Sequence, residues 1–209
     1  MLAGLSSLTC IAGLSCRVTI PSLEATDPNM TDQERAHVVK LLEDSHKKYL
    51  CSLEDVNETQ WNWEPAPGGW SVSQTAEHIL LAEIVMFSAV ERAIASPQNL
   101  DWEESTAGKT ELLEQVMPDR SQKALAPAPV EPRQAMAKAE VIRRFNKLRE
   151  KTIRFAKETC VPLKEHTCEH PFPIFNTLNA YQWLLYIPLH NLRHDQQIAE
   201  IKATPGYPE

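Results

Sequence analysis

The sequence has few glycines, no long hydrophobic run and no excess of positive charge. No segment approaches the roughly 18 consecutive apolar residues of a membrane helix, so we expect no membrane span. The 21 basic and 28 acidic residues give a formal net charge of −7, which argues against a nucleic-acid partner. Six glycines, and the lack of alternating β-branched segments between turn signals, exclude most all-β folds. The composition therefore predicts an all-α protein.

Cysteine is also scarce. The five cysteines are an odd number, in a chain of 209 residues that is long enough to fold as one domain without disulfides. We therefore expect reduced thiols and a cytoplasmic location.

The first 29 residues show no helical periodicity. Residues 2–20 have the apolar composition of a secretory leader, but the first basic residue is Arg17, whereas a leader carries its positive charge before the apolar region. Met30 is an alternative start, because it directly precedes Thr31 and Glu34, which match a capping box. We predict that residues 1–29 form an extension outside the fold and that residues 30–209 form the folded domain.

Apolar residues at three- and four-residue steps predict four long helices. The first runs from Thr31 to before Trp61, and the second from a capping box at Ser71 to near Pro97. The third and fourth span about residues 132–159 and 177–201. Residues 98–131 contain three prolines and no sustained period, so we expect a long, partly ordered crossover between the second and third helices. This pattern predicts a four-helix bundle.

The third predicted helix is strongly basic. Residues 133–157 include nine basic and two acidic side chains, a composition that could bind anions. Four of the basic residues flank the apolar stripe, which favours a solvated face instead. These residues are Arg144, Lys147, Lys151 and Arg154.

Three histidines lie on the predicted inward faces of two helices. His78 belongs to the second helix, and His190 and His194 lie one turn apart on the fourth, where both rings can point to one atom. A single inward histidine is more simply a neutral ring held by a hydrogen bond. Three buried rings without a shared partner are costly, whereas one metal ion satisfies a nitrogen of each. From the residues alone, both interpretations stay open.

The neighbours of the pair exclude one familiar chemistry. Zinc proteases carry a glutamate directly after the first histidine, but Asn191 follows His190 here. No Gly-rich phosphate loop, nucleophile elbow or catalytic Cys-His motif occurs. Pro188, two residues before His190, predicts a bend of the helix beside the pair.

A second set of ligand types occupies the segment before the fourth helix. His166, Cys168 and His170 alternate there, followed at once by Pro171, so no helix can present the two histidines as one face. A fourth zinc ligand would have to be the distant Cys160. We predict that this segment is not the metal site.

The inward histidines lie within a set of motifs: Trp70-Ser71, Glu77-His78, YQWLLY at 181–186 and HNLRHDQQI at 190–198. This set resembles the DinB-like superfamily, and the resemblance covers about residues 31–208. The family fold is a four-helix bundle with a long connection between the second and third helices. Its metal triad takes one histidine from the second helix and a His-x-x-x-His pair from the fourth. The resemblance thus implies that His78, His190 and His194 bind a divalent metal such as zinc, nickel or iron.

The resemblance also implies a class of activity. Members of the family resemble metal-dependent enzymes that activate a low-molecular-weight thiol or water, for transfer to or hydrolysis of a small-molecule substrate. The alternative is a non-catalytic metal-binding or stress-response protein. The sequence identifies no catalytic base, and we expect Glu83 and Asp195 to be packing partners or supports of the ligands. The sequence leaves open whether the protein is an enzyme and whether it forms a homodimer.

Overall fold

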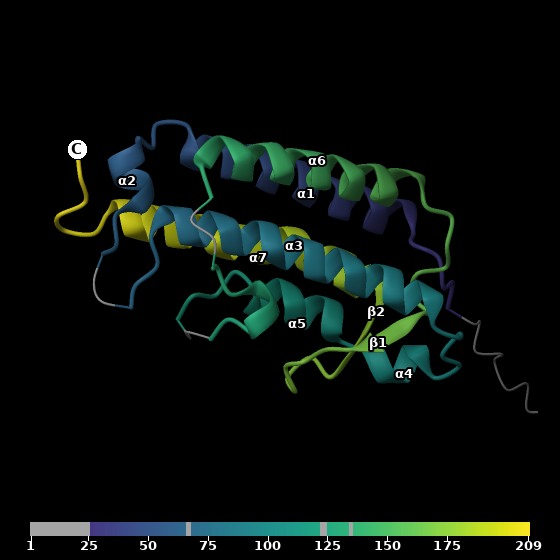
Figure 1. Cartoon of the computed structure of the whole chain (residues 1–209). Helices are drawn as coiled ribbons and strands as arrows, with labels where there is room; N and C mark the ends of the chain where they lie inside the picture. The colour runs from purple at the N-terminus through teal and green to yellow at the C-terminus, as the bar shows by residue number, and fades with distance from the viewer. Residues whose placement is uncertain (1–25, 66–67, 122–124, 134–135) are drawn as a thin grey trace, which may run out of the picture.

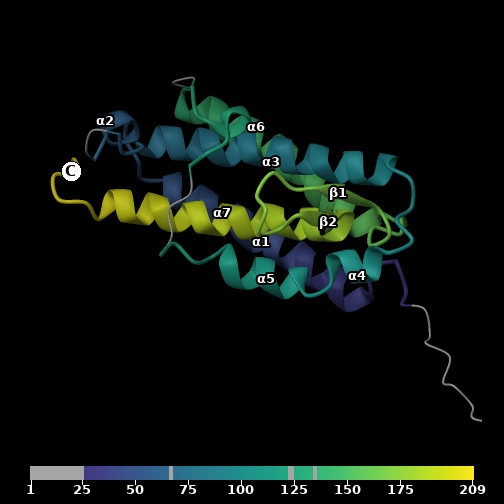
Figure 2. The same ribbon diagram turned by 90° about the horizontal axis from the view of Figure 1, so that it is seen from below.

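A computed structural model describes residues 26–65, 68–121, 125–133 and 136–209. Four long helices make up its body, and neighbouring contacts follow the cyclic order α1, α6, α3, α7 (Figures 1 and 2). The prediction of an all-α four-helix bundle is confirmed. The four helices are α1 (Asp32–Leu53), α3 (Val72–Ala95), α6 (Lys138–Glu158) and α7 (Ala180–Lys202).

The helix starts follow local capping chemistry. Complete capping boxes open α1 at Thr31 and α3 at Ser71, as predicted. Two further boxes, at Asn57 and Asn179, correct the sequence-based boundaries. The first helix does not continue toward Trp61, because Asn57 starts the short helix α2 (Glu58–Asn62) instead. The fourth helix begins after Asn179 rather than at about residue 177.

The connection between α3 and α6 is long, as predicted, but more ordered than expected. It contains the helices α4 (Trp102–Thr106) and α5 (Lys109–Val116) and the short 3-10 helix η1 (Ala128–Val130). Figures 1 and 2 show α4 and α5 beside the bundle, where α5 packs against α7 and its Glu114 pairs with His37 of α1. The third long helix starts at Lys138, later than the predicted residue 132. We call residues 117–130, from the end of α5 to η1, the crossover segment.

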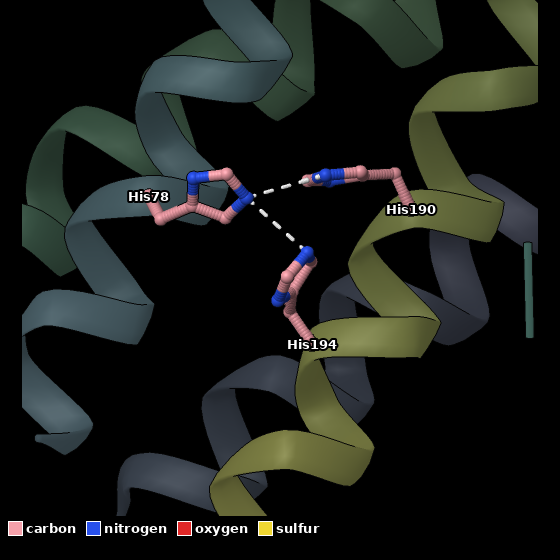
Figure 3. A group of neighbouring side chains, drawn as sticks. All are labelled: His78, His190 and His194. Carbon is pink, nitrogen blue, oxygen red and sulfur yellow. Dashed lines mark hydrogen bonds between the residues drawn. The ribbon is translucent and has the colours of Figure 1, made fainter. Parts of the chain in front are cut away.

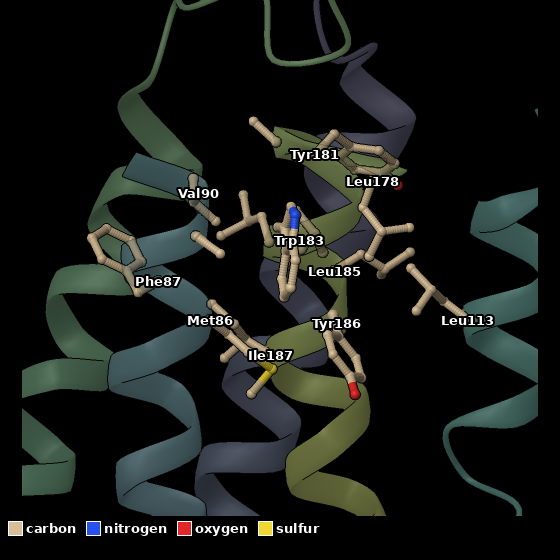
Figure 4. Packing of buried hydrophobic residues seen from close by; sticks show 14 of the residues in the cluster. Met86, Phe87, Val90, Leu113, Leu178, Tyr181, Trp183, Leu185, Tyr186 and Ile187 are labelled. Atoms are coloured by element: carbon tan, nitrogen blue, oxygen red, sulfur yellow. The ribbon is translucent and has the colours of Figure 1, made fainter. Parts of the chain in front are cut away.

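A small hairpin precedes α7, in the segment where Pro171 argues against a helix. Strands β1 (Thr167–Glu169) and β2 (Thr177–Asn179) pair antiparallel, with Cys168 opposite Leu178. The hairpin and the helix α7 then place an aromatic and aliphatic cluster against α3. Figure 4 shows Met86 and Val90 of α3 facing Trp183 and Ile187 of α7, whereas Phe87 points away toward Phe155 of α6.

The centre of the bundle holds an ion pair that the sequence did not predict. Arg149 of α6 is 0% exposed and donates two short bonds to Glu83 of α3, from Nε to Oε1 (3.0 Å) and from Nη2 to Oε2 (2.8 Å). It also donates to the carbonyl of Leu42 and to Ser45 Oγ of α1, and to Asn191 Oδ1 of α7. One guanidinium therefore links all four helices, and its full set of partners compensates for burying a charge.

The other basic side chains of α6 behave largely as predicted. Lys147, Lys151 and Arg154 are exposed, and Arg144 is half-buried with its guanidinium against Met136 Sδ. The solvated-face interpretation therefore holds for the flank of α6, and Arg149 is the exception to it.

The prediction for residues 1–29 lies mostly outside the described residues, which begin at Thr26. The described remainder contacts the domain, because the Pro28 carbonyl accepts a hydrogen bond from the Lys164 amide (3.0 Å). Met30 is buried in the core. The division of the chain at residue 30 stays a prediction. None of the described helices combines the length and apolar character needed to cross a membrane.

Candidate metal centre

The structure brings together the three histidines named from the sequence. His78 on α3 faces His190 and His194, which lie on successive turns of α7 (Figure 3). His78 Nε2 is 3.3 Å from His190 Nε2 and 3.2 Å from His194 Nε2. One nitrogen of each ring lies within 4.8 Å of the other two. Two neighbouring long helices thus aim three imidazole nitrogens at one point.

Two of the rings have their proton placed by the protein. His78 Nδ1 lies 2.7 Å from the Val130 carbonyl oxygen, which can only accept, so this nitrogen must donate. His194 Nδ1 lies 2.8 Å from Gln197 Oε1 and donates in the same way. A neutral imidazole with its proton on Nδ1 carries a lone pair on Nε2. The 3.2 Å contact between His78 and His194 therefore joins two acceptors with no proton between them.

A cation explains this spacing. Two imidazole nitrogens that bind zinc at 2.0–2.1 Å in tetrahedral geometry lie about 3.4 Å apart. The 3.2 Å and 3.3 Å separations are close to that value. The donor set and its geometry therefore fit a divalent metal ion, with one or more coordination positions left for another ligand.

The electrostatics of the three rings also suit metal binding. Burial lowers the pKa of His78, and burial together with the neighbouring His78 ring lowers the pKa of His194 to about 3. Burial, with His194 and His78 nearby, holds the pKa of His190 well below its usual range. All three rings are therefore neutral near pH 7, the state in which imidazole binds metal.

Aromatic side chains border the triad. Trp70 packs against His78 with ring centroids 4.9 Å apart, and Tyr186 packs edge-on against His190 at 5.9 Å. His78 and His194 are buried, whereas the His190 residue is partly exposed. Two surface hollows of about 550 and 370 Å³ lie near α4 and the start of α7, and neither is lined by a residue of the triad.

The sequence comparison decides the family. The family model of the DinB superfamily matches residues 41–198, which is more than half of the chain. The chain belongs to the DinB superfamily.

Two Bacillus subtilis proteins are similar to this DinB superfamily member. The uncharacterized protein YuaE of strain 168 is 24% identical over 153 residues, which cover 72% of this chain and 88% of YuaE. The solved structure of YfiT, described as a probable metal-dependent hydrolase with an unusual four-helix bundle topology, matches with a TM-score of 0.52. That match has 12% identity and covers 86% of this chain and 92% of YfiT. At this identity the likeness to YfiT supports the fold alone.

In this DinB superfamily member, the carboxylates of Glu83 and Asp195 are both buried. Glu83 accepts hydrogen bonds from Arg149 and from Thr152 Oγ1 (3.0 Å), so it is a packing partner, as expected. Asp195 is 2% exposed, and burial raises its pKa to about 7. Neither of its oxygens has a hydrogen-bond partner among the described residues. Neither carboxylate contacts a nitrogen of the triad.

The segment before α7 does not assemble a second site. His166 Nδ1 donates to the Ser96 carbonyl (3.1 Å), and His170 Nδ1 accepts from the Phe172 amide (3.0 Å). Cys160 is exposed and Cys168 is half-buried. Within the part of the chain that the structure describes, the triad is the one close group of three histidine, cysteine or acidic ligands.

The sequence did not predict the groups that accept hydrogen bonds from the Nδ1 atoms of His78 and His194. Gln197 lies three residues after His194 on one helix face, and this spacing was the available signal. Val130 lies 52 residues from His78, and nothing in the sequence pattern pairs them.

Proposed function

We propose that this protein is a metal-dependent enzyme that acts on a small molecule, with one divalent metal ion held by His78, His190 and His194. The main observation in support of this proposal is the contact between the Nε2 atoms of His78 and His194, two acceptors 3.2 Å apart. Membership of the DinB superfamily supports the proposal. So does the description of YfiT as a probable metal-dependent hydrolase, although its likeness to this chain extends to the fold only.

The ligand set suits catalysis better than a closed structural site. Three neutral histidines leave the full charge of a bound divalent ion in place and leave coordination positions open. When bound, such an ion lowers the pKa of a water molecule or a thiol toward neutrality, which supplies a nucleophile for hydrolysis or for thiol transfer. His78 and His194 keep their protons on Nδ1, which holds their lone pairs toward the centre.

Metal content tests the ligand assignment. Full-length protein purified without a histidine tag or chelator is expected to carry one equivalent of zinc, nickel or iron. His190→Ala should lose that metal while its helical circular dichroism is retained. His37→Ala is the matched control, because His37 is an exposed histidine that pairs with Glu114. Full metal content in His190→Ala would show that the triad is not the site.

Open coordination separates an enzyme from a binding protein. Cobalt-loaded protein should change its visible and near-ultraviolet absorption when a small thiol is added, because the thiolate enters a free position. A spectrum that does not respond to thiol, azide or pH would support the alternative, a metal-binding protein without turnover. Comparing ester and amide hydrolysis with thiol conjugation, each with loaded and stripped protein, then distinguishes the two enzyme classes.

A further inference from the structure

The crossover segment reaches the triad at two places, directly through Val130 and indirectly through Arg120, which contacts Gln197. At its end, the Val130 carbonyl accepts the Nδ1 proton of His78. Near its start, Arg120 donates from Nη1 to Gln197 Oε1 (3.4 Å), the same oxygen that accepts from His194 Nδ1 at 2.8 Å. One connection thus reaches ligands on both α3 and α7.

The Gln197 contact matters because an amide can face either way. With Oε1 toward His194, the ring must donate from Nδ1, and Nε2 keeps the lone pair that binds metal. With the amide reversed, its NH₂ group would donate to Nδ1 and the ring proton would move to Nε2, where it blocks the metal position. The orientation of one amide therefore decides whether His194 is a ligand.

Arg120 favours the orientation of the Gln197 amide in which Oε1 faces His194. A guanidinium only donates, so beside Gln197 it favours the oxygen over the NH₂ group. Arg120 is itself held by a two-bond pair with Glu200, Nε to Oε1 and Nη2 to Oε2, both 2.7 Å. The Arg120 side chain is 17% exposed, whereas that of Glu200 is 57% exposed. Glu200 lies on α7 three residues beyond Gln197, which keeps Arg120 in place along the helix.

We infer that Arg120 is a positioning residue of the metal centre, which sets the tautomer of His194 through the amide of Gln197. The crossover segment thereby completes a site whose three ligands all lie on other elements. This inference rests on the proposed function only in requiring that the triad binds metal. Groups that hold a metal-binding histidine from behind typically change metal affinity by about 10- to 100-fold when they are removed.

Zinc affinity of the full-length protein, measured by competition with a chromophoric chelator, tests the inference. Arg120→Ala and Gln197→Leu should each weaken binding about 10-fold or more. Gln197→Glu should bind within a few-fold of the unmodified protein, because a carboxylate accepts from Nδ1 in either orientation. Arg143→Ala is the matched control, since it removes an exposed arginine–glutamate pair on α6, with Glu140.

The double variant Arg120→Ala with Gln197→Glu separates positioning from folding. It lacks the pair with Glu200, as Arg120→Ala does, but its carboxylate no longer needs an orienting donor. We expect its zinc affinity to recover to that of Gln197→Glu. Unchanged affinity in Arg120→Ala, or a double variant as weak as Arg120→Ala, would overturn the inference.

The tautomer itself can be observed without metal. Two-bond proton–nitrogen correlation spectra of ¹⁵N-histidine protein should show His194 protonated on Nδ1, and a shift toward Nε2 in Arg120→Ala. An unchanged tautomer in that variant would contradict the inference. Failure of the proposed function gives a different result, in which neither the unmodified protein nor any variant binds zinc.

Discussion

The bundle contains two buried polar clusters, and their hydrogen bonding differs in kind. In the ion-pair cluster around Arg149 and Glu83, every donor of the guanidinium that the structure records meets an acceptor, on three other helices. In the triad, the facing nitrogens of His78 and His194 are both acceptors. The protein itself supplies the partners of the Arg149 guanidinium, whereas the two facing acceptors of the triad fit the cation proposed above.

Helix α7 serves both clusters from two of its faces. His190 and His194 point to the triad, while Asn191, between them in sequence, accepts from Arg149 Nη2 at 3.0 Å. The ion-pair cluster thus contacts the helix that carries two of the three proposed ligands. The following experiments test the contrast between the two clusters, from the largest expected effect to the smallest.

Breaking the ion pair should have the largest effect on stability. Arg149→Leu leaves Glu83 buried without its main partner, and such a change costs about 3–5 kcal/mol of unfolding free energy. Urea unfolding at neutral pH measures the loss. Replacing both residues with leucine should recover most of it, because no uncompensated charge then remains. A loss below about 1 kcal/mol in the single variant would show that the pair is not a structural centre.

Removing metal should have a smaller effect on the unfolding free energy, and only in protein that has bound metal. A ligand present at 100 times its dissociation constant stabilises the folded state by about 2.7 kcal/mol, so chelator should lower the unfolding free energy of metal-loaded protein by about that amount. His190→Ala should not respond to chelator. Equal responses of the two proteins would place the metal outside the triad.

A buried histidine outside the triad, His170, should make the stability of the fold depend on pH. Burial lowers the pKa of His170 to about 4, while its Nδ1 accepts from the Phe172 amide. Below pH 6.5 the unfolded chain takes up a proton that the folded ring refuses, so this stability is full above pH 6.5 and is lost as pH falls toward 4.

Between pH 7 and pH 5, His170 should account for a loss of about 2 kcal/mol of unfolding free energy. His170→Phe should remove that part of the pH dependence in urea unfolding. His46→Phe, which replaces a half-buried histidine paired with Asn146, serves as the control. The same pH dependence in His170→Phe and the unmodified protein would assign the effect to other groups.

Shortening the start of the chain should have the smallest effect on stability. A chain beginning at Met30 lacks the bond from the Lys164 amide to the Pro28 carbonyl, which is worth about 1 kcal/mol. Its thermal midpoint should therefore fall by only a few degrees relative to the full chain. A chain beginning at Thr26 should match the full chain. A large drop for both would show that residues 1–25 stabilise the bundle.

The sequence by itself determined the features that depend on local chemistry. Capping residues act within three positions, so the starts of α1 and α3 were predictable at Thr31 and Ser71. The apolar periods predicted four long helices, and the family motifs named the histidines that the structure brings together. The late starts of α6 and α7 were missed because a stripe of apolar residues does not mark where a helix begins.

Only the tertiary structure decided which polar groups meet. Arg149 lies four residues after Phe145 and three before Thr152, on the buried face of α6, but a basic residue at such a position has no visible partner in the sequence. The contacts of Val130 with His78 and of Arg120 with Gln197 join residues 52 and 77 positions apart. Local propensity does not act over such separations. Buried polar groups need hydrogen-bond partners, and the tertiary fold decides which partners lie close enough.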